Sequence, residues 1–192
     1  IIAPNGAMNA KKLIAVVEDE TSGLPEAACQ VLKEIIGALS ALEDRIGRLD
    51  AEIRARAQSN EVARRLMTVP GIGPLIATAL VALAPPPEIF RRGRDFAAWL
   101  GLVPRQHSTG GKQRLGATPK MGERSLRRLL IIGANSVIIK RHVHQTAQPG
   151  TWLAGMLSRK PPMLVRVALA NKMARVRSAH SDGSRSGSHS GP

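Results

Sequence analysis

The spacing of apolar residues predicts a chain built mainly of α-helices. Between residues 24 and 57 the apolar positions recur at alternating steps of four and three, which is the heptad pattern of a coiled-coil seam. The seam positions are Ile35, Leu39, Leu42, Ile46, Leu49 and Ile53. We expect a long helix that either pairs with a second copy or lies on its own domain, because about three heptads are marginal alone.

Helical spacing also predicts several shorter elements. They are a helix over residues 7–17, one ending near Thr68, an apolar one after Gly73, a short one from Asp95, and helices over 123–140, 151–158 and 162–177. The last helix should be basic on one side, with Asn171 and Lys172 outward. Three prolines at 85–87 should end the apolar helix, because proline lacks an N–H donor. The expected fold is mostly α: a long coiled-coil helix followed by a small helical domain.

The same patterns divide the chain into four parts. We expect residues 1–23 to be a linker or the remnant of a preceding domain, 24–60 the coiled-coil arm, 61–177 the second domain, and 178–192 a disordered tail. The tail is rich in Ser, Gly and His and has too few apolar residues to form a core. The first ten residues lack an initiator Met and the features of a signal peptide, so we expect the interior of a longer chain.

Residues 65–82, RLMTVPGIGPLIATALVA, match the helix-hairpin-helix pattern. One helix ends, a turn containing Gly71 and Gly73 follows, and a second apolar helix begins. In this motif the turn presents backbone N–H groups to a DNA phosphate without reading the bases. A hairpin used only for packing would carry the same glycines, so both interpretations stay open.

Positive charge is concentrated in the second half of the chain. The whole sequence has 28 Lys and Arg against 14 Asp and Glu, a net charge of +14. Residues 1–90 hold 9 basic and 11 acidic side chains, a net of −2, whereas residues 91–177 hold 18 basic and 2 acidic ones, a net of +16. Such a localised excess indicates a polyanionic partner. With only two Phe, two Trp and no Tyr, backbone-phosphate contacts are favoured over base stacking.

A basic, glycine-rich loop at residues 104–122 carries the candidate chemistry. Ser108 and Thr109 are the hydroxyls at its apex, and are therefore the candidate nucleophiles towards a phosphodiester. The candidate DNA-binding residues are Gly71 and Gly73 in the hairpin, followed by Arg105, Lys112, Arg114, Lys120, Arg124, Arg127 and Arg128. A loop that binds phosphate without performing chemistry is the alternative.

Other features exclude several classes of protein. The single Cys29 leaves no disulfide framework and no Cys-rich zinc site, and it fits a reducing cytoplasm. His180 and His189 have no neighbouring ligand cluster in the sequence. No apolar run approaches the roughly 18 to 20 residues that span a membrane. We expect no metal or cofactor in this chain, no membrane partner and a cytoplasmic location.

Three segments together resemble a known family. They are VPGIGPLIATALVA, FAAWLGLVPRQHSTGGKQRLGATPKMGERSLRRLLIIGA and MLVRVALANKMARV. The resemblance is to the C-terminal half of the insertion-sequence transposases that join an Asp-Glu-Asp-Asp nuclease-like domain to a serine-bearing domain. Members of this family are regarded as bridge-RNA-guided DNA recombinases. The resemblance covers essentially residues 1–177.

This resemblance implies a function in DNA transposition and recombination. The family's nucleophilic serine would fall on Ser108, with Thr109 as the fallback, and residues 24–57 would form a homo-oligomer. DNA and a guide RNA would be the partners. The family's metal-binding carboxylates belong to a domain that would precede residue 1, so Mg²⁺ is implied there and not in this chain. Whether the chain alone is an enzyme stays open, and the alternatives are a non-enzymatic helix-hairpin-helix DNA-binding module and a basic RNA-binding protein.

Overall fold

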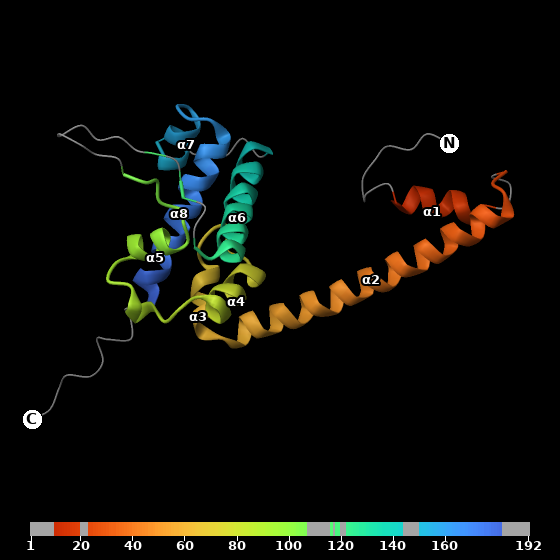
Figure 1. The fold of residues 1–192 in the computed structure, drawn as a ribbon, viewed down its shortest axis with the longest axis horizontal. Coiled ribbons are helices and arrows are strands. Elements are labelled where there is room, and N and C mark those ends of the chain that lie inside the picture. The colour runs from red at the N-terminus through yellow and green to blue at the C-terminus, as the bar shows by residue number, and fades with distance from the viewer. Residues whose placement is uncertain are drawn as a thin grey trace, which may run out of the picture. The chain divides into compact units, whose positions relative to one another are not determined.

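The computed structural model describes residues 10–19, 23–106, 116, 118–119, 122–143 and 150–181. In these residues the secondary structure consists of eight α-helices and one short 3₁₀ helix, with no strand (Figure 1). The expectation of a mostly α fold with a long helix in its first half is therefore confirmed. The chain forms two compact units, residues 1–52 and 53–192, which we describe in turn.

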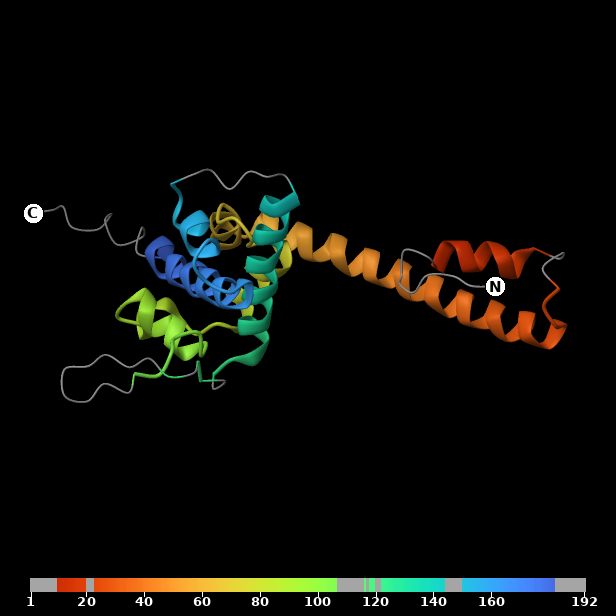
Figure 2. The same ribbon diagram turned by 90° about the horizontal axis from the view of Figure 1, so that it is seen from above.

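The first unit contains α1 (Ala10–Glu18) and most of α2 (Glu26–Ser59). α1 lies alongside the N-terminal part of α2 (Figure 2). The predicted seam forms one stripe along α2. Five of its six side chains are exposed: Ile35 51%, Leu39 47%, Leu42 56%, Ile46 62% and Leu49 52%, whereas Ile53 is half-buried. These percentages are high for large apolar side chains in a regular row, so the stripe has the character of an uncovered packing face.

The second unit begins with a helical hairpin. Asn60 separates α3 (Glu61–Met67) from α2, because its Oδ1 accepts a hydrogen bond from the Ala63 N–H at 2.9 Å and caps the new helix. After α3, the turn passes through Gly71, whose φ of 91° favours glycine. α4 (Pro74–Leu83) then starts with proline at its first position, where the missing N–H costs no hydrogen bond.

The segment after α4 follows the proline prediction. Ala84 is extended, and a 3₁₀ turn, η2 (Pro87–Ile89), leads to α5 (Gly93–Trp99). α5 starts two residues before the expected Asp95, because Asp95 is the third helical residue and caps the helix from within. Its Oδ2 accepts a hydrogen bond from the Arg92 N–H at 3.0 Å.

The remaining helices are α6 (Arg124–Val143), α7 (Trp152–Leu157) and α8 (Pro162–Ser181). α8 runs four residues beyond the predicted end at residue 177, into the segment expected to be a disordered tail. The rest of that tail lies outside the described residues. α8 packs against both α5 and α6 and forms the centre of this unit (Figures 1 and 2).

Leucines and aromatic rings fill the core of the second unit. Its largest fully buried side chains are Leu66, Leu80, Phe96, Leu100, Leu102, Leu126, Leu130, Ile138 and Val165. Phe96 stacks on Trp99 with ring centroids 5.7 Å apart and meets Phe90 edge-on at 5.2 Å. Each of α3 to α6 and α8 contributes to this core, which explains why their apolar residues recur at helical spacing.

The hairpin turn and α6 approach each other closely at two glycines. A Cβ added to Gly71 would lie only 2.8 Å from the Gly133 carbonyl oxygen, and one added to Gly133 would collide with the Gly71 carbonyl oxygen. Since protein interiors have little free space, only residues without a Cβ allow this approach.

We therefore expect Gly133→Ala to destabilise the second unit by about 1–3 kcal/mol, because the methyl group would force two backbones apart. The midpoint of urea denaturation measures the loss. Gly155→Ala in α7 is the matched control, because its added Cβ would meet only the Arg159 side chain, at 3.8 Å. A Gly133→Ala protein as stable as the Gly155→Ala protein would contradict this packing argument.

Candidate nucleic-acid interface

A backbone hydrogen bond joins the two described sides of the basic loop at residues 104–122, which carries the candidate serine and is called the serine loop below. The Gly116 N–H donates a hydrogen bond to the Arg105 carbonyl oxygen at 2.7 Å, and the Arg105 side chain is exposed. Residues 107–115, which include Ser108, Thr109, Lys112 and Arg114, lie outside the described residues, as does Lys120. This hydrogen bond holds Arg105 and Gly116, on either side of the serine-bearing segment, together.

The first turns of α6 place three predicted DNA-binding arginines differently. Arg124 and Arg128 are exposed, whereas Arg127 is half-buried. The Arg127 Nη1 donates a hydrogen bond to the Leu100 carbonyl oxygen at 3.3 Å, which ties α6 to the end of α5. Arg127 therefore helps to hold α6 against the end of α5, whereas Arg124 and Arg128 present positive charge to the solvent.

The two hairpin glycines also differ, because one contacts another helix and the other is exposed to solvent. Gly71 has a positive φ and contacts α6, whereas Gly73 is exposed, has a φ of −90° and would meet nothing within 4 Å if it carried a Cβ. Gly73 is the N-cap of α4, and no side chain caps this helix. The first backbone N–H groups of a helix lack partners within it, so this end of α4 can donate to an anion.

A hollow of about 450 Å³ lies between this turn and α6. Residues 67–73 form one side, and Ser136 and Val137 form the other. The contact between Gly71 and α6 supports the packing interpretation of the glycines, while the uncapped end of α4 leaves room for the phosphate interpretation. The geometry is compatible with both roles at once.

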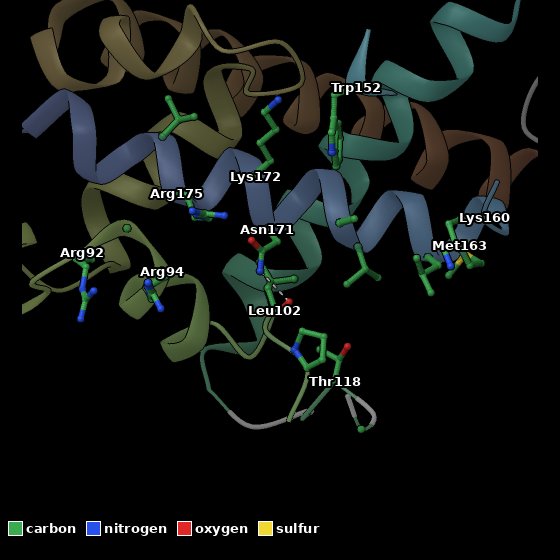
Figure 3. A pocket seen from close by; sticks show the side chains of 17 residues that line it. Arg92, Arg94, Leu102, Thr118, Trp152, Lys160, Met163, Asn171, Lys172 and Arg175 are labelled. Carbon is green, nitrogen blue, oxygen red and sulfur yellow. Dashed lines mark hydrogen bonds between the residues drawn. The ribbon is translucent and has the colours of Figure 1, made fainter. Parts of the chain in front are cut away.

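Five further cations lie along α8, and of these the sequence pattern had singled out only Lys172. Arg92 and Arg94 come from the start of α5, and Lys160, Lys172 and Arg175 from α8 and the residues just before it (Figure 3). They line a cavity of about 1360 Å³. The sequence contains a pattern that is typical of one helix face lining this cavity, because from residue 160 onward the lining residues recur every three or four positions.

One expectation for α8 needs correction. Lys172 is exposed, as predicted, but Asn171 is half-buried. Its Nδ2 donates a hydrogen bond to the Leu102 carbonyl oxygen at 3.0 Å. The outward prediction for Asn171 was wrong because a backbone acceptor distant in sequence lies beside this position of α8.

The described residues contain no group of three or more His, Cys, Asp or Glu side chains that could hold a metal ion. They therefore do not fit the Mg²⁺ that the resemblance implies for the family. In the same part of the chain, no helix is long and apolar enough to cross a membrane.

Comparison with known proteins finds a match within the second unit. Residues 63–148 match the model of the transposase IS116/IS110/IS902 family. This segment is therefore similar to that transposase family. It includes nearly all of the hairpin, together with α5, the basic loop at residues 104–122 and α6, whereas α2, α7 and α8 lie outside the match.

Several named proteins are similar over most of the chain. A probable family 20 transposase of Pseudomonas aeruginosa is 47% identical over 85% of this chain and 48% of its own length. The transposase for insertion sequence element IS1328 of Yersinia enterocolitica is 36% identical over 92% of this chain and 52% of its own length. The transposase for insertion sequence element IS1111A of Coxiella burnetii is 35% identical over 86% of this chain and 45% of its own length. The chain thus spans about half the length of these relatives, and the resemblance to insertion-sequence transposases is confirmed.

Proposed function

We propose that this chain is the DNA-binding part of a transposase that catalyses transposition and recombination of an insertion sequence. The similarity to named transposases over most of the chain carries this proposal. The net charge of +16 over residues 91–177 supports DNA as the partner, because neutralising phosphates is the main source of affinity for duplexes.

In this proposal the hairpin and the first turns of α6 contact the DNA backbone. The uncapped end of α4 at Gly73 would donate backbone N–H groups to one phosphate, as in a helix-hairpin-helix motif. The exposed Arg124 and Arg128 would bind neighbouring phosphates. Such contacts hold the protein on the duplex without reading its sequence.

Ser108 is the proposed nucleophile, with Thr109 as the fallback. Its Oγ would attack a DNA phosphorus and lose its proton to the surroundings, while the bond from phosphorus to one deoxyribose oxygen breaks and that oxygen takes up a proton. The cut end is then held as a phosphoserine ester, which preserves the bond energy for strand exchange. Arg105, Lys112, Arg114 and Lys120 would stabilise the charge that develops on the phosphate.

The remaining parts of the proposal concern the longer protein. Since the chain spans about half of its relatives, we assign the implied Mg²⁺ and guide RNA to a complete transposase that acts in the cytoplasm. The exposed stripe of α2 supports self-association of that protein through residues 24–57.

DNA binding should be strongly dependent on salt. The logarithm of the binding constant should fall with the logarithm of salt concentration, at about 0.9 per phosphate contact. Changing Lys112 and Arg114 together to Ala should make the slope shallower, whereas changing Lys11 and Lys12 should alter it little. Fluorescence anisotropy with a labelled duplex measures both slopes. A binding constant indifferent to salt would rule out this interface.

Ser108 should be required for a covalent adduct but not for DNA binding. We expect no adduct from the 192-residue chain by itself, because a serine hydroxyl needs a base or a metal to activate it and the described residues contain no group of side chains that could hold a metal ion. A fusion to the N-terminal part of the Pseudomonas relative, given Mg²⁺ and guide RNA, should yield a protein–DNA adduct on denaturing gels.

In that fusion Ser108→Ala should abolish the adduct and leave the salt-dependent binding nearly unchanged. Thr109→Val is the matched control. Loss of the adduct with Thr109→Val but not with Ser108→Ala would identify Thr109 as the nucleophile. An adduct that survives both changes would refute the serine mechanism, and full transposition activity with Ser108→Ala would favour the binding-module alternative.

Self-association should depend on the α2 stripe. Leu42→Asp would place an unpaired charge within the apolar seam and should convert an oligomer into monomers in sedimentation experiments at tens of micromolar. Ala51→Asp, two positions beyond Leu49 and on the outer face, is the matched control and should have no effect. A monomeric unmodified chain would show that the stripe has another role.

A further inference from the structure

The cavity along α8 is an elongated groove. Lys160, Met163, Leu164, Val167, Ala168 and Arg175 are among the residues of one wall, and they occupy successive turns of the helix or its entry. Within α8, from Met163 to Arg175, the helical rise corresponds to about 18 Å. The start of α5, together with Leu102 and Pro104, lies on the opposite wall (Figure 3). The groove is therefore as long as a helix of about three turns.

The groove exposes large apolar side chains. Met163 is 61% exposed, Leu164 50% and Trp152 42%. The opposite side of α8 is already committed to the core, where Val165 and Met173 are buried. A helix that is apolar on two sides normally buries both, so the groove side is expected to have a cover that the described chain does not supply.

The charges around the apolar floor are all positive. Arg92, Arg94 and Arg175 lie towards one end of the groove and Lys160 towards the other (Figure 3). Among the described residues that line it, none is acidic. Arg92, Arg94 and Arg175 lie near one another because the backbones of α5 and α8 approach closely at Gly93. A Cβ added to Gly93 would lie 2.5 Å from the Arg175 carbonyl oxygen.

These features favour a protein ligand over a nucleic acid or a small molecule. The cavity of about 1360 Å³ exceeds the roughly 300–1,000 Å³ typical of small-molecule sites. Single-stranded nucleic acids bind by stacking on aromatic rings, and Trp152 is the one ring in this lining. Lys172 Nζ already lies 4.8 Å from its centroid. Phosphates alone would leave the aliphatic floor in contact with water.

We propose that this groove binds an α-helical segment of another protein, apolar on one face and carrying carboxylates near both ends. Apolar side chains at helical spacing would fill the floor, as in other helix-in-groove complexes. The carboxylates would pair with Lys160 at one end and with Arg92, Arg94 and Arg175 at the other, and so set the direction and register of the helix. This inference is independent of the proposed DNA chemistry, because Ser108 and the hairpin take no part in it.

A designed peptide tests the proposal on the full chain. The probe is a fluorescein-labelled helix of about 18 residues, with Leu on one face and Glu near both ends, and the matched peptide has Lys in place of each Glu. We expect the acidic peptide to bind at least tenfold more tightly than the basic one, measured by anisotropy. Leu164→Asp should weaken this binding at least tenfold, because the new charge would lie against an apolar face.

Control variants separate a local effect from misfolding. Ile89→Asp places the same charge at an apolar side chain that is 66% exposed and outside the groove, and it should leave peptide binding unchanged. Met163→Asp should reproduce the effect of Leu164→Asp. All three proteins should keep the circular dichroism and unfolding midpoint of the unmodified chain.

Several results would overturn the proposal. They are equal affinity for the two peptides, no binding of either, or acidic-peptide binding that Leu164→Asp leaves intact. A single-stranded oligonucleotide that displaces the peptide and loses affinity with Leu164→Asp would identify a nucleic-acid groove instead. If Leu164→Asp dissociates an oligomer of the unmodified chain, the groove is an interface between copies.

Discussion

The close approach of Gly71 and Gly133 is the constraint on which the second unit depends. It sets the turn of the hairpin directly against the backbone of α6, with no side chain between them. α6 in turn reaches the end of α5 through the hydrogen bond from Arg127 to Leu100. The hairpin, α5 and the proposed DNA-binding face of α6 are therefore held by one framework.

α8 has a second organising role, because it is apolar on two sides. One side completes the core beneath α5 and α6, and the other forms the floor of the cation-rimmed groove. The hydrogen bond from Asn171 to Leu102 fixes α8 to the segment that leads towards the serine loop. The same helix thus stabilises the second unit and presents a surface that the family match does not include.

The proposed activities use surfaces of different chemical character. Residues 91–177 combine high positive charge with few aromatic side chains, which suits contacts to a phosphate backbone. The stripe on α2 and the groove on α8 are apolar, and both fit helices rather than nucleic acid. The proposed function would use both kinds of contact, one to hold DNA and the other to assemble with protein parts.

The sequence by itself determined the helices, the long seam and the similarity to insertion-sequence transposases. These depend on local spacing, on caps and prolines, and on a contiguous motif, all of which are properties of neighbouring residues. It placed the start of α5 and the end of α8 within a few residues of their observed positions. It also identified the basic segment, but not how the charges of that segment are arranged in space.

Only the tertiary structure decided which residues meet. The inward position of Asn171, the anchoring hydrogen bond of Arg127 and the grouping of Arg92 and Arg94 with Arg175 all join segments far apart in the chain. No periodicity along one helix encodes such contacts, because they depend on how closely two backbones approach. In this protein Gly93 permits the approach of α5 to Arg175, and Gly71 and Gly133 permit the approach of the hairpin turn to α6, because none of them has a Cβ.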